Sequence, residues 1–305
     1  MAGFLARRLF DLLITVLGVS TLTFAVLRMT GDPVDFMLPP EATQQMVAEM
    51  RHQLGLDVPL PVQYVRFLVG AARGDLGESF RYREPALRLV ASAIGPTLSL
   101  AAVSIGAAVA IAVPLGIVAA VYRNTMVDKA AMVLTVFGQS VPFFWLGIIL
   151  VIAFAVNRNW LPTSGYGSPA HFVLPTITLA AFALARIARL TRSGMLDVLG
   201  QDYMRTARAK GLREAVIIGR HGLRNAAIPI LTMIGLHFGV LMGGAVVTET
   251  IFAWPGLGRL IITSIYLRDY PVVQAGVLYM ALVFVVINSA LDMSYWLIDP
   301  TIRRE

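Results

Sequence analysis

Residues 96–121, PTLSLAAVSIGAAVAIAVPLGIVAAV, form an apolar stretch without a charged side chain. An α-helix rises about 1.5 Å per residue and needs about 20 apolar residues to cross the hydrocarbon core of a bilayer. This stretch is therefore long enough to span a membrane. Five further segments have the same character, so the sequence predicts transmembrane helices over residues 9–29, 96–121, 130–156, 173–191, 226–251 and 272–297.

The composition of the whole chain agrees with a multi-pass membrane protein. Of 305 residues, 57% are hydrophobic and 14% are charged, against about 25% charged residues in a typical soluble domain. The absence of cysteine excludes disulfides and thiolate chemistry, and the four scattered histidines form no HExxH metal motif. The first apolar segment is long for a signal peptide, and no A-x-A site follows it, so we expect a retained span.

The distribution of basic residues predicts the orientation. With the N-terminus inside, the inner segments and the basic end of the fourth span hold 15 Arg and Lys residues, whereas the short outer loops hold three. The excess matches the positive-inside rule, and we read the net charge of +7 as membrane topology rather than nucleic-acid binding. We therefore predict an all-α fold of six spans with both termini in the cytosol.

These spans divide the chain into four parts. We expect a tail and first helix over 1–29, an extracytoplasmic segment over 30–95, a five-helix core over 96–297 and a cytoplasmic tail over 298–305. Turn signals at Gly31-Asp32-Pro33, Leu38-Pro39-Pro40 and Leu60-Pro61 punctuate the extracytoplasmic segment. Between them, 41–54 reads as a short helix that Glu41 and Ala42 open and Gly55 ends.

The inner loop 192–225 has the most informative pattern. It reads as helical with one break at Gly211, a residue suited to a positive φ after a helix. Beyond the break, Leu212, Val216, Gly219 and Leu223 share one helical face, and Ala207 with Gly211 makes a small-xxx-small pair. Two interpretations of this amphipathic loop stay open: it docks in a groove of a partner protein, or it lies on anionic lipid.

The loop resembles the EAA-type motif of permeases from ABC importers. The general motif is matched at Ala207, Gly211 and Leu223, with Arg205 and Thr206 at its other opening positions. The string from Asp202 to Gly211, followed by His221-Gly222-Leu223-Arg224-Asn225, is similar to the variant of the dipeptide, oligopeptide and nickel branch. Further strings of that branch occur at Gly31-Asp32-Pro33, Leu54–Asp57, Gly74–Gly77, Trp254–Arg259, Arg268–Pro271 and Asp299-Pro300, and a glutathione-importing variant looks close.

This resemblance implies a type I importer permease in the inner membrane of a bacterium. It implies one of two permease subunits, with a paralogue as the second, two ATPase subunits that bind ATP–Mg, and an extracytoplasmic substrate-binding protein. The substrate class it implies is peptides, with glutathione, a nickel complex or another small solute as the alternative. The coupling contact with the ATPase is expected at Tyr203, Arg205, Thr206, Ala207, Arg208, Lys210, Gly211, Leu212 and Leu223.

The chain itself is expected to be a permease and not an enzyme. A Walker A loop needs G-K-[ST], and neither Lys129 nor Lys210 stands in such a context. We expect no cofactor or metal bound by this chain, and membrane lipid but no nucleic acid among its partners.

Four residues of the fifth span are candidates for the pathway or for helix packing. Gly235, Gly239 and Gly243 repeat every fourth residue and leave one face without side chains. His237 is an ionisable residue in the middle of the same span, where such groups are functional candidates. For the glycines, tight packing against a neighbouring helix is the favoured explanation.

Alternatives from other classes have weaker support. Arg186, Arg189 and Arg192 have voltage-sensor spacing but lie at the cytoplasmic end of a span, where they anchor topology. A stand-alone secondary transporter often has repeats around ionic sites, and no repeat is evident here. An intramembrane hydrolase would use Ser140, but Pro142 replaces the closing glycine of G-x-S-x-G. Pro114 and Pro142 are candidate kinks within spans.

Overall fold

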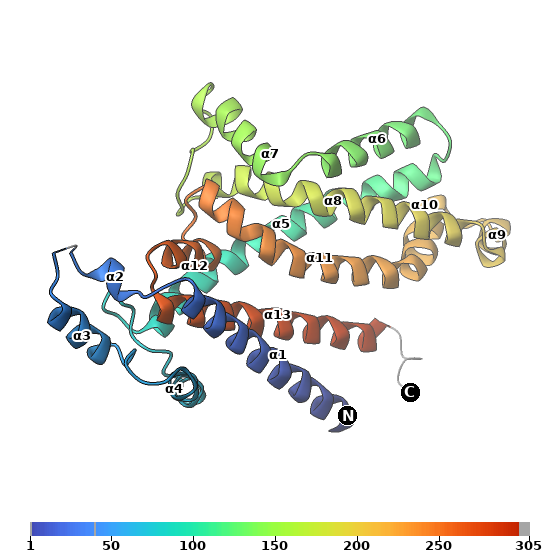
Figure 1. Cartoon of the computed structure of the whole chain (residues 1–305). Helices are drawn as coiled ribbons and strands as arrows, with labels where there is room; N and C mark the ends of the chain where they lie inside the picture. The colour runs from blue at the N-terminus through green and yellow to red at the C-terminus, as the bar shows by residue number, and fades with distance from the viewer. Residues whose placement is uncertain (1, 40, 299–305) are drawn as a thin grey trace. The chain divides into compact units, whose positions relative to one another are not determined.

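The structure, a computed structural model, describes residues 2–39 and 41–298 and is helical, with no strand in these ranges. The chain forms two compact units (Figure 1). Unit 1 comprises residues 1–97 and 255–285, and unit 2 comprises residues 98–254 and 286–305. The predicted cytoplasmic tail lies outside the described residues except for Ile298.

Five helices are long and apolar enough to cross a membrane, and a bent pair of helices brings the number to as many as six. The prediction of six spans agrees with this pattern. The helices that contain these spans, written with their bounds, are α1 (Ala2–Met29), α5 (Ala86–Val121), α6 (Met126–Ser140) with α7 (Phe143–Leu150) and the π-helix η1 (Val151–Val156), α8 (Pro169–Leu199), α11 (Arg224–Ile251) and α13 (Tyr270–Ile298).

The third span is broken at the predicted proline. α6 and α7 meet at a bend of 97° after Ser140, and Pro142 precedes the first residue of α7 (Figure 1). Proline has no N–H to donate, and its ring disfavours helical geometry in the residue before it. Val141 accordingly has an extended backbone. Pro114 has no such effect, since α5 continues through it to Val121.

Unit 2 is built around α8, which packs against α5 and α11. Buried alanines dominate this core, and Leu179, Ile187 and Met195 fill it between the helices. Gly116 allows the close approach of α5, because a Cβ atom there would lie 2.6 Å from the carbonyl oxygen of Ala188. Small residues at such positions let helix backbones pack tightly.

The outer end of unit 2 is closed by aromatic residues. Trp254 is fully buried, and its ring meets those of Tyr166 and Phe172 edge to face at 4.8 and 4.6 Å. This geometry is the one that ring quadrupoles favour. The aromatic cluster joins the loop after η1 to the end of α11.

Unit 1 contains α1, the segment 30–95 that was predicted to be extracytoplasmic, and the first part of α13. The segment contains α2 (Val34–Met37), α3 (Gln44–Gln53) and α4 (Leu60–Ala72). The predicted helix 41–54 begins at Gln44 rather than at Glu41, because the side chain of Thr43 caps it by accepting from the N–H of Met46. The turn at Gly55 is as predicted, with a φ of 65°.

Three helices of unit 1 were not predicted: α2, α4 and α12 (Leu257–Tyr266). All three are shorter than a membrane span, so a search for long apolar stretches does not find them. The hydroxyl of Thr97 accepts from the N–H of Leu257 at 2.8 Å and so caps the start of α12.

A buried carboxylate fixes the loop before α5. Asp269, fully buried before α13, accepts from the hydroxyl of Ser79 at 2.5 Å and from the N–H of Phe80 at 3.0 Å. The Ser79 oxygen in turn accepts from the N–H of Tyr82 at 2.9 Å. Charged hydrogen bonds of this kind satisfy a buried carboxylate, and here they hold residues 79–82 against the turn that leads into α13.

Candidate functional site

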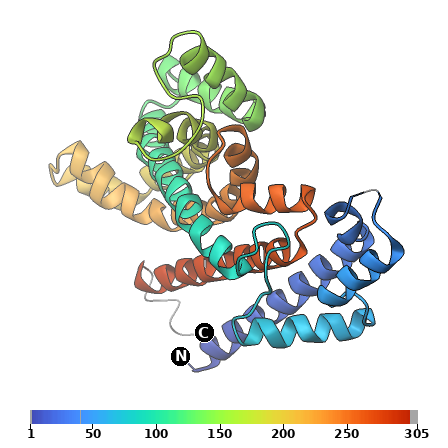
Figure 2. The same ribbon diagram turned by 90° about the vertical axis from the view of Figure 1, so that its left-hand side faces the viewer.

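The predicted coupling loop is a helical projection between α8 and α11 (Figure 2). α8 continues to Leu199, so residues 192–199 of the predicted loop are the end of that helix. α9 (Asp202–Ala209), α10 (Glu214–Val216) and the π-helix η2 (Ile217–Leu223) follow, and η2 runs directly into α11. The loop is therefore held at both ends by long helices of unit 2.

Gly211 forms the break between α9 and α10. Its φ is +73°, a region that side chains with a Cβ atom rarely adopt. A Cβ atom there would have no neighbour within 4 Å, so the backbone conformation and not the available space favours glycine. The N–H of Gly211 donates to the carbonyl of Arg208 at 2.9 Å, and Lys210 donates to Thr206 at 3.0 Å. These bonds close the end of α9.

The inner side of the loop is a small apolar cluster. Met204, Ala207 and Ile217 are buried and pack together, with Val198 and Leu199 at the end of α8 beside them. Ala207 retains 7% exposure and faces this cluster. Its small side chain thus brings α9 close to η2 of the same chain.

The outer side of the loop is polar and exposed. Tyr203 and Leu212 keep 43% and 42% of their surface exposed. The Tyr203 hydroxyl accepts from the Asn225 side chain at 3.1 Å, and Arg208 pairs with Glu214 at 2.8 Å across the turn. Of the residues predicted for the coupling contact, those on this exposed side are Tyr203, Arg205, Thr206, Arg208, Lys210, Gly211 and Leu212.

The second half of the loop differs from the predicted amphipathic helix. Leu212 lies before α10, and the helix turns into a π-helix at Ile217, so the spacing of residues on one face changes. Ile217 is buried, while Val216 and Gly219 stay exposed and Leu223 is half-buried. The apolar residues Leu212 and Val216 therefore lie on the surface of the loop.

The candidate pathway residues lie along α11 in different environments. Gly235 is buried, Gly239 is half-buried, and Gly243 is exposed with no atom within 4 Å of a would-be Cβ. Gly243 lines an apolar cavity of about 190 Å³ with Phe143 and Phe182. Gly243 thus presents open helix backbone, whereas the backbone at Gly235 is already covered.

His237 is buried among helices of unit 2, with 2% of its surface exposed. Its ring meets the ring of Phe182 edge to face at 6.0 Å, and the guanidinium of Arg186 lies 4.7 Å from the centre of Phe182. Neither ring nitrogen of His237 has a hydrogen-bond partner among the described residues. Buried polar atoms are ordinarily paired, so His237 retains unused hydrogen-bonding capacity.

The serine considered for a hydrolase has an ordinary helical environment. Ser140 is the last residue of α6, and its hydroxyl donates to the carbonyl of Val136 at 2.9 Å. A nucleophile elbow places its serine on a sharp turn between a strand and a helix. The bend at Pro142 joins two helices, so this geometry is absent there.

A cavity in unit 1 was not predicted from the sequence. It is formed by α1, the segment 53–83 and the start of α13, and its lining includes Arg28, Glu78 and Gln274. These residues are separated by up to 246 positions and share no motif. Only folding brings them together, although two of the strings quoted from the sequence, Leu54–Asp57 and Gly74–Gly77, contribute residues to the lining.

The chain matches the model of a protein family over most of its length. Residues 112–304 match the binding-protein-dependent transport system inner membrane component, and residues 1–101 match the N-terminal part of the membrane component of such systems. The chain belongs to this family. It is an inner-membrane permease subunit of an ABC importer.

Curated relatives agree with this assignment from end to end. The permease is 46% identical over 304 residues to the glutathione transport system permease protein GsiC of Salmonella paratyphi A, and 45% identical to GsiC of Escherichia coli K12. In each case the match covers 99% of both chains.

Solved structures support the fold. Two inward-facing structures of the MetNI methionine ABC transporter match with TM-scores of 0.60 and 0.58 at 20% and 21% identity. They cover 69% and 70% of this permease and 96% and 97% of the matched chains. The predicted type I permease fold is therefore confirmed.

Proposed function

We propose that this permease imports short peptides, with glutathione as the first substrate to test, as part of an ATP-driven complex. The observation that carries the proposal is the identity of 46% with the glutathione permease over 99% of both chains. Peptide transport was the first choice from sequence motifs, and glutathione is itself a short peptide. The motifs and the similarity to the glutathione permease therefore both indicate a short peptide as the substrate.

The complete importer would contain four kinds of subunit. We infer a second permease, two ATPase subunits that bind ATP–Mg, and an extracytoplasmic binding protein that delivers the solute. The family description names binding-protein-dependent transport, which supports the last of these. The two lysines of this chain lie outside any Walker A pattern, which supports an ATPase on separate subunits.

The loop between α8 and α11 would be the coupling element. Its exposed side carries the basic residues Arg205, Arg208 and Lys210 beside the apolar surface of Leu212 and Val216. Charged and apolar groups in one small area suit a protein groove, in which the apolar part is buried and the charges fix the orientation. Closure of the ATPases on ATP would move the docked loop, and the loop would shift α8 and α11 between two states.

Helix packing is the function that we propose for the glycines of α11. Gly243 would accept a helix of the second permease, since small residues allow close contact between helices in a membrane. His237 would offer its unpartnered ring nitrogens to the pathway or to a group on that second subunit.

Purification of the permease from its native membrane in mild detergent tests the assembly. We expect mass spectrometry to find a Walker A ATPase and a second multi-pass permease in the complex. Reconstituted vesicles with the binding protein should then take up labelled glutathione only when ATP is present on the loop side. Uptake by the isolated chain without ATP would overturn the proposal and favour a secondary transporter.

A further inference from the structure

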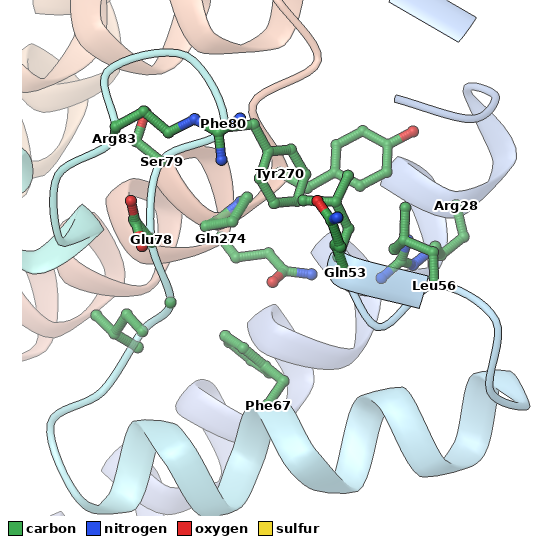
Figure 3. Close-up of a pocket in the computed structure, with 14 residues that line it drawn as sticks. Arg28, Gln53, Leu56, Phe67, Glu78, Ser79, Phe80, Arg83, Tyr270 and Gln274 are labelled. Carbon is green, nitrogen blue, oxygen red and sulfur yellow. The ribbon is translucent and has the colours of Figure 1, made fainter. Parts of the chain in front are cut away.

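The part of unit 1 that is expected outside the membrane contains a partly open cavity of about 340 Å³ (Figure 3). Its walls come from the end of α1, the turn after α3, α4, the loop 76–83 and the first turns of α13. Pockets for small ligands have volumes of about 300–1,000 Å³. The cavity is therefore large enough for one small solute.

The charged residues of the cavity are two cations and one anion. Arg28 and Arg83 supply guanidinium groups, and Glu78 supplies a carboxylate. Figure 3 shows Glu78 and Arg28 on opposite sides of the cavity, with Arg83 near Phe80. A ligand that complements this lining has two carboxylates and one amine, because guanidinium groups bind carboxylates in strong charge-assisted hydrogen bonds.

Arg28 is held in place without using all of its donors. Its guanidinium carbon lies 5.2 Å from the ring centre of Phe24 and 5.3 Å from that of Tyr270. Such cation–π contacts orient an arginine but occupy none of its N–H groups. The Nε atom is buried and has no hydrogen-bond partner among the described residues.

Gln274 lies on the floor of the cavity in the first turns of α13. It is only 8% exposed, and Figure 3 shows its amide pointing into the centre of the cavity. No hydrogen bond of this amide occurs among the described residues, and its atoms are not among the fully buried polar atoms without a partner, so they are accessible from the cavity. The amide can therefore both donate to and accept from a bound peptide group.

Other polar groups of the wall are already engaged. The Ser79 hydroxyl donates to Asp269, and the Tyr270 hydroxyl donates to the carbonyl of Gly31. These bonds fix the wall, and Phe67 and Phe80 give it an apolar side. The cavity thus combines a rigid frame with a guanidinium group and an amide in its lining, from Arg28 and Gln274.

We propose that this cavity binds a short peptide with two carboxylates and one amine, the charge pattern of glutathione, on the extracytoplasmic side of the permease. The two arginines bind the carboxylates, Glu78 binds the amine, and Gln274 binds a peptide group. This inference rests on the proposed function for the choice of peptide, whereas the charge pattern comes from the cavity itself.

The test uses the full chain with its co-purifying subunits in phosphatidylcholine nanodiscs, without binding protein or ATP. Equilibrium dialysis with radiolabelled glutathione should show saturable binding that is at least tenfold weaker in Arg83→Gln and in Gln274→Met. Arg81→Gln is the matched control, because Arg81 is exposed in the same loop but does not line the cavity. Glutathione diethyl ester, which lacks both carboxylates, should not compete.

The variants are chosen so that a loss of binding does not result from misfolding. Gln274→Met keeps the shape of the side chain and removes an amide that has no partner, so the thermal midpoint should not fall. Equal binding by all variants, or binding of the label that excess unlabelled glutathione does not displace, would overturn the proposal. Binding in this cavity without ATP-driven uptake would instead contradict the proposed function, and uptake with no binding in the cavity would leave that function standing.

Discussion

The guanidinium of Arg192 donates two hydrogen bonds, of 2.6 and 2.7 Å, to the carboxylate of Asp128 and so links α8 to the start of α6 within unit 2. The N–H of Asn124 adds a third bond to the same carboxylate at 3.0 Å. Arg192 had been expected only to anchor membrane topology. Its side chain also closes the turn between α5 and α6.

This pair is expected to stabilise unit 2. Asp128 is 5% exposed and Arg192 24%. Removal of one partner from a buried pair costs about 3–5 kcal/mol, and partial exposure reduces this to roughly 2–3 kcal/mol for Asp128→Asn or Arg192→Gln. The thermal midpoint of the detergent-solubilised protein should fall by several degrees in each variant. The double variant should lose less than the sum of the two, and simple additivity would contradict the pairing.

Gly116 and Gly106 on α5 offer a matched comparison of helix packing. Gly116→Ala places a Cβ atom 2.6 Å from the Ala188 carbonyl and 2.6 Å from Thr191 Cβ, so we expect a loss of about 1–3 kcal/mol. Gly106→Ala meets no atom within 4 Å and should be neutral, or more stable by up to about 1 kcal/mol, since alanine favours helix. Thermal midpoints measure both. Equal thermal midpoints for the two variants would contradict the close contact between α5 and α8 at Gly116.

Substitution of Gly211 tests the coupling loop. Gly211→Leu forces a leucine into a φ of +73°, at a cost of about 1–2 kcal/mol confined to the exposed turn. We expect normal membrane insertion but loss of glutathione uptake, while ATP hydrolysis continues. Gly219→Leu is the control, because Gly219 is exposed in the same loop, is not among the glycines with positive φ, and has no atom within 4 Å of a Cβ. Wild-type uptake by Gly211→Leu would refute the assignment.

Ser79 is expected to protect the loop before α5 from proteolysis. Ser79→Ala removes one donor to Asp269 and leaves the N–H of Tyr82 without its acceptor, at a cost of about 1–3 kcal/mol. The loop should then open more often, and trypsin should cut sooner at the exposed Arg81 and Arg83. Ser92→Ala, which loses only a local bond to Leu89, serves as the comparison. An unchanged cleavage rate in Ser79→Ala would show that the Phe80 bond suffices.

The extracytoplasmic pair His52–Asp57 predicts a pH dependence. A hydrogen bond of 2.7 Å between the imidazole and the carboxylate raises the pKa of His52 and lowers the pKa of Asp57. The contribution of His52 to stability is complete below its unfolded pKa and is lost as pH rises through its raised folded pKa. That of Asp57 is lost as pH falls through its lowered pKa. NMR titration of the His52 ring should show the raised pKa, and Asp57→Asn should return it towards the ordinary value.

The long helices could be predicted because their burial in lipid imposes one simple rule, about 20 apolar residues per crossing. The turn at Gly211 was predicted as well, since glycine acts locally. Pro142 was one of two candidate kinks, and only the structure shows that the helix breaks there and not at Pro114. α4 and α12 were missed because short helices depend on neighbours such as Thr97, which caps α12 from a distant part of the chain.

In the candidate sites too, features set by neighbouring residues could be predicted, whereas features that depend on distant residues could not. The loop was located from a contiguous string of residues, although the inward position of Ala207 and the π-helix at Ile217 required the structure. The cavity around Gln274 could not be predicted from the sequence, because its lining residues come from five separate stretches of the chain. Pairing of Arg192 with Asp128 was missed for the same reason, since 64 residues separate them.

The bend between α6 and α7 also decides which compartment contains the loop after α8. Each half of the pair is shorter than the roughly 20 residues that a crossing needs, so only the two together traverse the bilayer. With the N-terminus inside, a complete third crossing makes α8 the fourth, and an even number of crossings returns the loop to the cytosol, where ATP is found. If the third segment instead re-entered and left on the same side, α8 would be the third crossing, and Gly211 would lie outside the cell. Access of the loop to an ATPase therefore depends on the membrane insertion of two half-length helices joined at Pro142.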